Sequence, residues 1–124
     1  MKKKAFTLME LMIALAVMAI MAAIVVSVYR GYVRKAARSA LQTDTRNCIT
    51  CVSAELARIA LTGGSPNFSN CTSRISRYTQ SCSVTQLGVE LYRCTCSGRG
   101  IIAGSICILN TESTSFESGS ENCE

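Results

Sequence analysis

The chain has 124 residues, 48% of them hydrophobic, with eight cysteines and a formal charge of +5. It has no histidine, which excludes Ser/His/Asp and Cys/His catalysis and histidine-ligated metals. Three positive charges are the lysines at positions 2–4, so ten basic minus eight acidic residues leave +2 elsewhere. This charge is too small for a general polyanion binder. With no glycine-rich phosphate loop either, we expect neither an enzyme, nor a cofactor, nor a nucleic-acid partner.

The chain begins with a long apolar segment, Phe6–Tyr29, in which Glu10 is the single charged residue. Twenty-four helical residues extend about 36 Å, which is enough to span a bilayer. The segment is too long for the apolar core of a cleaved secretory signal, and no polar break follows it. A lone carboxylate in a bilayer costs about 2.5 to 3.5 kcal/mol on insertion scales. Glu10 therefore needs a functional explanation.

Residues 30–62 are predicted to continue the helix as an amphipathic half. Apolar residues recur at steps of three or four, which indicates one buried stripe. The stripe comprises Tyr29, Val33, Ala37, Ala40, Leu41, Cys48, Val52, Leu56 and Ile59. Between them lie residues suited to the exposed side, namely Arg34, Arg38, Gln42, Arg46 and Arg58. Gly63-Gly64 supplies a left-handed cap and Pro66 forbids continuation, so we expect one helix from about Phe6 to Leu61.

Residues 63–124, which we call the head, are predicted to form a small antiparallel β-sheet. Apolar and polar residues alternate from Leu87 to Cys96, and Ile101–Leu109 is a second apolar run. The turn sequence Ser97–Gly100 separates them, so the two runs are expected to form a hairpin. Tyr78–Val84 is a weaker strand. The expected fold class is α+β, with the long helix packed on the sheet.

Eight cysteines follow the apolar segment, and none lies within it. They are Cys48, Cys51, Cys71, Cys82, Cys94, Cys96, Cys107 and Cys123. An even number in a small domain behind an export-like N-terminus indicates disulfides in an oxidising compartment, with 105 connectivities open. Cys48 and Cys51, on one helical face, are expected to reach head cysteines and join helix to sheet. Less favoured are a redox Cys-x-x-Cys and a zinc site with Cys94 and Cys96.

Charged residues are segregated along the sequence. Arg30–Arg46 holds five basic residues against Asp44, whereas Asn110–Glu124 holds four glutamates and no basic residue. Two interpretations stay open: solvated faces, or complementary patches on neighbouring copies of a self-assembling protein. Contact of the basic cluster with lipid headgroups is a further possibility, because it directly follows the apolar segment.

The N-terminus, Lys-Lys-Lys-Ala before Phe6-Thr7-Leu8-Met9-Glu10-Leu11 and an apolar helix, closely resembles that of type IV pilins. The spaced tyrosines Tyr29 and Tyr32 extend the resemblance. It implies that residues 1–5 are a leader, which an inner-membrane prepilin peptidase cuts between Ala5 and Phe6 before methylating the new α-amine. It also implies that Cys107 and Cys123 close a C-terminal loop. Ala5 departs from the glycine usual in the family, and Ser27 from the proline of many members.

The resemblance further implies a type IVa-like major pilin, a structural subunit without enzymatic activity. Residues 6–29 would hold the precursor in the inner membrane and later form the core of an extracellular filament built by the pilus assembly machinery. Such filaments serve adhesion, twitching motility or uptake. A minor pilin, a type II secretion pseudopilin and a membrane-anchored binding domain that never polymerises are the alternatives.

Two features of the apolar segment fit assembly. Glu10 gains a cation at its own depth when cleavage creates the α-amine of Phe6 on the next copy. Ala19, Ala23 and Ser27, spaced four apart, form a stripe of small residues suited to close helix packing.

Overall fold

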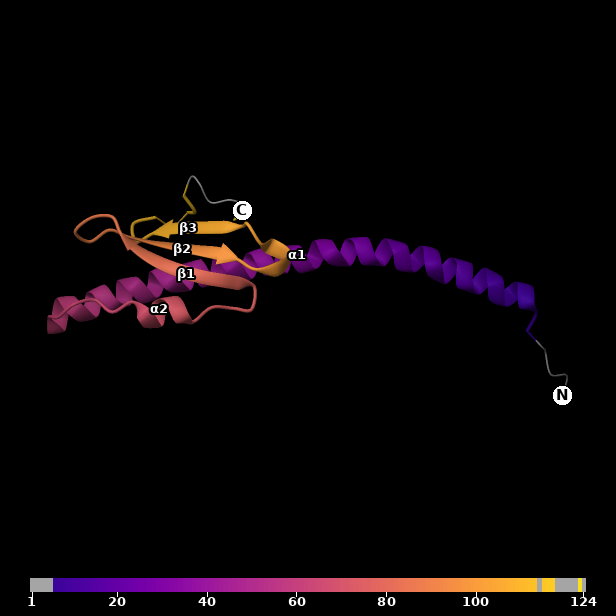
Figure 1. The fold of residues 1–124 in the computed structure, drawn as a ribbon, viewed down its shortest axis with the longest axis horizontal. Coiled ribbons are helices and arrows are strands. Elements are labelled where there is room, and N and C mark those ends of the chain that lie inside the picture. The colour runs from indigo at the N-terminus through magenta and orange to yellow at the C-terminus, as the bar shows by residue number, and fades with distance from the viewer. Residues whose placement is uncertain (1–5, 114, 118–122, 124) are drawn as a thin grey trace. The chain divides into compact units, whose positions relative to one another are not determined.

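The structure, a computed structural model, describes residues 6–113, 115–117 and 123. The chain divides into two compact units, Met1–Val33 and Arg34–Glu124. The elements in order are α1 (Leu8–Thr62), α2 (Ser69–Ser73), β1 (Thr79–Gln86), β2 (Tyr92–Gly98), a 3₁₀ turn (Gly100–Ile102) and β3 (Ile106–Asn110) (Figure 1). The three strands form an antiparallel sheet in the order β1-β2-β3. The predicted α+β class, a long helix packed on a small sheet, is confirmed.

α1 ends where the sequence predicts, within one residue. Gly63 has φ 70° and Gly64 φ 114°, the left-handed region that glycine adopts without steric cost. The Gly63 N–H donates to the Ile59 carbonyl at 2.8 Å and satisfies one of the last free carbonyls of the helix. The helix continues without interruption through Ser27 and Gly31.

The predicted hairpin is formed by β2 and β3, although its connection differs from the expected turn. Ser97 and Gly98 still belong to β2, and the chain reverses through the 3₁₀ turn and Gly104, which has φ 89°. Gly98 is required because a Cβ there would collide with the carbonyl oxygen of Ile102. The apolar run that starts at Ile101 therefore becomes a strand only from Ile106 onwards.

The prediction that a strand begins at Leu87 is wrong. Residues 87–91 form a loop, closed by hydrogen bonds from the Leu87 N–H (2.8 Å) and the Gly88 N–H (3.2 Å) to the Leu91 carbonyl. These bonds reverse the direction of the chain and leave Val89 at the tip of the loop, where it is 93% exposed to solvent. The weaker predicted strand, in contrast, is present and extends to Gln86 as β1. The short helix α2 was not predicted.

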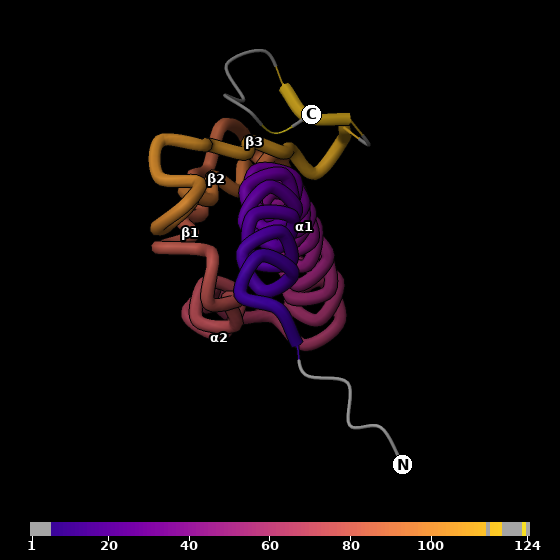
Figure 2. Tube along the Cα trace, turned by 90° about the vertical axis from the view of Figure 1, so that its right-hand side faces the viewer, coloured from indigo at the N-terminus to yellow at the C-terminus, as the bar shows by residue number. Residues whose placement is uncertain are grey.

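Within residues 34–124, the strands and α2 gather on one side of α1 (Figure 2). Two clusters of buried residues fill this interface. One joins Ala37 and Leu41 to Ile102 and to four cysteines, Cys82, Cys96, Cys107 and Cys123. The other joins Cys48 and Val52 to Cys71, Tyr92 and Cys94. Every second residue of β2 from Tyr92 onwards is buried, as the predicted alternation of that strand requires.

The buried stripe of α1 is confirmed at its centre and differs at its edges. Ala37, Leu41, Cys48 and Val52 are buried, whereas Tyr29 is 66% exposed. Asp44 and Thr45, which the apolar pattern left out, are buried between them. Two residues assigned to the exposed side, Arg38 and Gln42, are half-buried. Gln42 reaches inward because its amide donates a hydrogen bond to the carbonyl of Cys123.

All eight cysteines are paired. The disulfides are Cys48–Cys94, Cys51–Cys71, Cys82–Cys96 and Cys107–Cys123, and no cysteine is free. The alternatives of a four-thiolate zinc site and of a Cys48–Cys51 redox pair are therefore wrong. The last disulfide is the one that the pilin resemblance implied.

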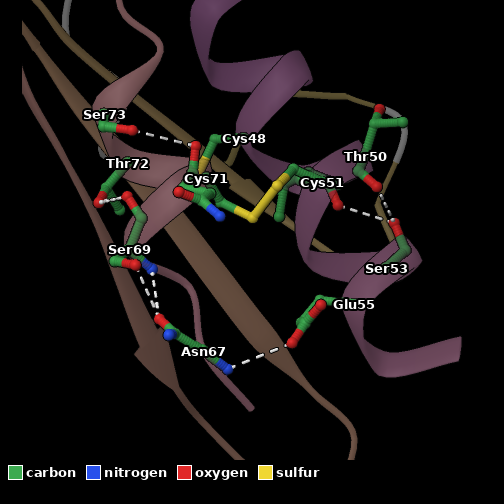
Figure 3. Close-up of a disulfide and its surroundings, with 12 residues drawn as sticks. Cys48, Thr50, Cys51, Ser53, Glu55, Asn67, Ser69, Cys71, Thr72 and Ser73 are labelled. Carbon is green, nitrogen blue, oxygen red and sulfur yellow. Dashed lines mark hydrogen bonds between the residues drawn. A yellow bond between two sulfur atoms is a disulfide. The ribbon is translucent and has the colours of Figure 1, made fainter. Parts of the chain in front are cut away.

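Cys48 joins α1 to the sheet as expected, but Cys51 joins α1 to α2 instead (Figure 3). The reason lies in the unpredicted helix, whose single turn places Cys71 beside α1. Its N-terminal side is held by Asn67, whose side-chain oxygen accepts hydrogen bonds from the Ser69 N–H at 3.1 Å and hydroxyl at 2.8 Å.

Candidate functional site: the uncovered N-terminal helix

The most prominent surface feature is the apolar N-terminal part of α1. Every residue from Phe6 to Tyr32 is exposed, including seventeen large hydrophobic side chains. Among the described residues, α1 is the one helix long and apolar enough to cross a membrane, and none of its most apolar window is buried. An exposed apolar surface of this extent requires lipid or another protein surface to cover it.

The first turn of this helix is organised by Thr7 and Glu10. The Thr7 hydroxyl accepts a hydrogen bond from the Glu10 N–H at 3.3 Å, and the Thr7 carbonyl accepts one from Leu11 at 3.3 Å. Thr7 therefore caps the helix, in the spacing of a capping box. Sequence reasoning missed this role, although the Thr-x-x-Glu spacing was a sufficient signal.

The Glu10 side chain is exposed. In the described part of the chain, its carboxylate takes part in no hydrogen bond or ion pair. Glu10 is the third residue of α1, so its side chain lies at the positive end of the helix dipole. Phe6, four residues earlier and 79% exposed, precedes the helix. The predicted cleavage residue Ala5 and the leader lysines lie outside the described residues.

The stripe of Ala19, Ala23 and Ser27 lies on the exposed surface of α1. The steps of four residues place the three side chains on one face. The hydroxyl of Ser27 donates to the carbonyl of Ile24 at 2.8 Å, so it is satisfied within the helix. The stripe is therefore both narrow and free of unsatisfied polar groups, as a closely packed helix interface in an apolar medium requires.

The head offers no comparable chemistry in its described residues. No group of three or more His, Cys, Asp or Glu side chains there is placed to hold a metal ion. Two open grooves, each of about 510 Å³, flank the end of α1. One is lined mainly by apolar side chains such as Leu56 and Ile59, and the other by Asn47, Thr50 and the Cys51–Cys71 disulfide. The predicted disulfide cysteines thus serve the fold.

Comparison with known proteins bears on the N-terminal segment alone. Residues 1–26 match the family model of the prokaryotic N-terminal methylation motif. No curated protein and no solved structure gives a significant match. The matched residues include Phe6, Glu10, Ala19 and Ala23, and they end inside the uncovered part of α1. This motif implies processing by a peptidase and a membrane-anchored precursor, and it supports a type IV pilin-like prepilin.

Proposed function

We propose that the chain is the structural subunit of a type IV pilus, cut between Ala5 and Phe6, methylated on Phe6 and polymerised through α1. The observation that carries the proposal is an apolar N-terminal part of α1 that is exposed on all sides and that holds, in its first turn, the carboxylate of Glu10 without an ion-pair partner among the described residues. A plain membrane anchor gains nothing from this carboxylate and loses about 2.5 to 3.5 kcal/mol by inserting it.

Polymerisation gives Glu10 a partner. Cleavage before Phe6 creates an α-amine at nearly the same depth as Glu10, and the amine of one copy can pair with the carboxylate of the next. Such a pair is strong in an apolar surrounding, where both charges are poorly screened. Because lipid and the filament core are both apolar, burial alone gives little driving force. The ion pair and the small-residue stripe then set the register between copies.

The proposed organisation follows from this role. Residues 1–5 are the leader, and residues 6–29 anchor the precursor in the inner membrane before they form the filament core. Residues 30–62 carry the head, residues 63–124, whose C-terminal loop is closed by Cys107–Cys123. Removal of Lys2–Lys4 takes away cytoplasmic charges that would oppose extraction of the helix from the membrane. The filament is extracellular and serves adhesion, motility or uptake, with this chain as its major subunit.

Substitution of Glu10 tests the proposal, with Thr7 as the matched control. Glu10→Ala should abolish or strongly reduce filaments sheared from the cell surface while the membrane pool of the subunit stays at its normal level. Thr7→Ala removes the helix cap but keeps the carboxylate, so it should leave most filaments in place. Electron microscopy and immunoblotting of sheared and membrane fractions measure both pools.

Three outcomes would contradict the proposal. Normal filaments from the Glu10→Ala variant would show that the carboxylate has no role in assembly. Equal losses from Thr7→Ala and Glu10→Ala would show that both residues act only through helix capping. If the unaltered chain stays in the membrane fraction and never forms filaments, it is instead a membrane-anchored binding domain that does not polymerise.

A further inference from the structure

Two arginines lie at one end of the sheet. Thr79, the first residue of β1, pairs with Gly98, the last residue of β2. Arg77 lies two residues before Thr79 and Arg99 directly follows Gly98, and the Arg99 N–H donates to the Tyr78 carbonyl at 2.7 Å. Both side chains are exposed. This end of the sheet packs on α1 near Ala37 through the Ile102 cluster, so the exposed Arg34 and Lys35, three and two residues before Ala37, belong to the same end. We call it the basic end.

Two glutamates lie at the opposite end of the sheet. Glu90 is in the loop between β1 and β2, and Glu112 follows the end of β3. Thr111 holds them together, because its N–H donates to the Tyr92 carbonyl at 3.0 Å and its hydroxyl to the Glu90 carbonyl at 3.4 Å. Both glutamates are exposed. The seven residues of β2 separate this acidic end from the basic end by about 20 Å.

Several other charged residues already have a partner within residues 34–124. Arg93 pairs with Glu117 at 2.8 Å, Arg58 pairs with Glu55 at 2.6 Å, and Arg46 stacks over the Phe116 ring at 5.4 Å. Within the described part of the chain, Arg77, Arg99, Glu90 and Glu112 form no ion pair, and the Arg77 guanidinium lies over the ring of Tyr78. The described residues therefore leave two exposed ends of opposite charge, and Arg77, Arg99 and Glu90 come from outside the two charged segments singled out in the sequence.

We propose that the basic end of one copy of this chain docks on the acidic end of the next copy, with Arg77 and Arg99 facing Glu90 and Glu112. The proposal rests on the proposed function, because it names the surfaces through which subunits of the filament meet. Helices that leave the same membrane in the same direction produce parallel copies. Successive heads along a filament then meet through unlike ends. Such a heterologous interface can repeat from copy to copy and build an open filament rather than a closed ring. Val89, exposed beside Glu90, adds apolar area to this contact.

A charge exchange tests the proposal in cells that assemble the unaltered chain. Arg77→Glu with Arg99→Glu reverses the basic end, and Glu90→Arg with Glu112→Arg reverses the acidic end. Each reversal alone should lower the yield of sheared filaments about tenfold or more, because like charges then face each other at every contact. The variant with all four substitutions restores the opposite signs and should return the yield to within about twofold of the unaltered chain. Ser83→Glu with Thr85→Glu, on the exposed face of β1, is the control for added negative charge and should have little effect.

The outcomes separate this inference from the function on which it rests. Normal filament yields from either reversal, or no recovery in the fourfold variant, overturn the end-to-end contact while the pilus role stands. The basic-end variant could instead fail to bind anionic membranes before assembly and not be rescued by the acidic-end reversal. This result would assign Arg77 and Arg99 to lipid headgroups and would also overturn the end-to-end contact. If the unaltered chain forms no filaments, the proposed function fails and the contact fails with it.

Discussion

The buried carboxylate of Asp44 on α1 accepts a hydrogen bond of 2.9 Å from the backbone N–H of Ser76, which lies just before the sheet. The same oxygen accepts a second bond from the hydroxyl of Thr79, the first residue of β1. One side chain of the helix therefore fixes the point at which the sheet begins. This contact positions the basic end of the head relative to residues 34–62.

We expect Asp44→Ala to lower the free energy of unfolding by about 2 kcal/mol, because two buried donors lose their acceptor. Asp44→Asn keeps an acceptor oxygen in the same place and should cost less. Urea unfolding of the detergent-solubilised chain, followed by circular dichroism, measures both. Equal stability of the alanine variant and the unaltered chain would contradict the assigned role.

The disulfides should differ in their contributions to stability. Cys48–Cys94 closes a sequence separation of 46 residues, whereas Cys82–Cys96 closes 14 between directly paired strand positions. Loss of the longer loop is expected to cost about 4 kcal/mol and loss of the shorter one about 3 kcal/mol, because the longer loop restricts the unfolded chain more. Paired Cys→Ala variants compared by urea unfolding give this order.

A thiol titration of the denatured, unreduced chain provides the control for these disulfide variants. It should detect no free thiol in the unaltered chain and none in either paired variant. Several free thiols in the unaltered chain, or a reversed order of the two stability losses, would be inconsistent with the disulfide framework.

The sequence was sufficient to predict the long helix, because apolar residues recur along it at helical spacing and Gly63-Gly64 marks its end. It was less informative for the sheet. Leu87 to Leu91 alternate like a strand, and only the backbone hydrogen bonds to Leu91 decide that this stretch is a loop. The burial of Asp44 likewise could not be predicted from the local sequence. A charged residue on the buried stripe becomes acceptable only through donors that lie 32 and 35 residues away in the sequence.

For the candidate site, the sequence carried most of the information. Glu10 and the small-residue stripe follow from residue types and spacing within one helix, whereas Phe6 follows from the resemblance to type IV pilins. The charged ends of the head did not follow, because Arg77 and Arg99 come together only through the pairing of β1 with β2. The sequence pattern instead pointed to the C-terminal glutamates, of which Glu117 is already paired with Arg93.

Glu55 should make the loop after α1 sensitive to acid. Hydrogen bonds from the Arg58 guanidinium, and to a smaller degree from the Asn67 N–H at 3.4 Å, lower the pKa of Glu55 below its usual value of 4.5. Because this pKa is lowered in the folded state, the ionised Glu55 side chain stabilises the fold at pH values above 4.5. This stabilisation is lost as the pH falls through the lowered pKa of Glu55. Residues 63–68 should therefore exchange amide hydrogens faster at acidic pH, after correction for the intrinsic rate.

The variant Glu55→Gln serves as the control for this pH effect. Its corrected exchange rates in residues 63–68 should show no change across the same pH range. A pH dependence that persists in Glu55→Gln would assign the effect to another group.

The small-residue stripe predicts a position-specific effect of side-chain size. Ala23→Leu places a bulky side chain on the stripe and should reduce filament yield severalfold, because the helices can no longer approach closely. Ala22→Leu makes the same change one position away, about 100° around the helix, and should have a smaller effect. Both variants should insert into the membrane normally. Equal filament yields from the two would show that the stripe is not the packing face.

The most direct test of the central claim is mass spectrometry of the N-terminal peptide of the chain recovered from sheared surface filaments. If the chain is a processed pilus subunit, this peptide begins at Phe6 and carries one methyl group on its α-amine. A chain that keeps Met1 and residues 2–5 and is found only in the membrane fraction would contradict the account.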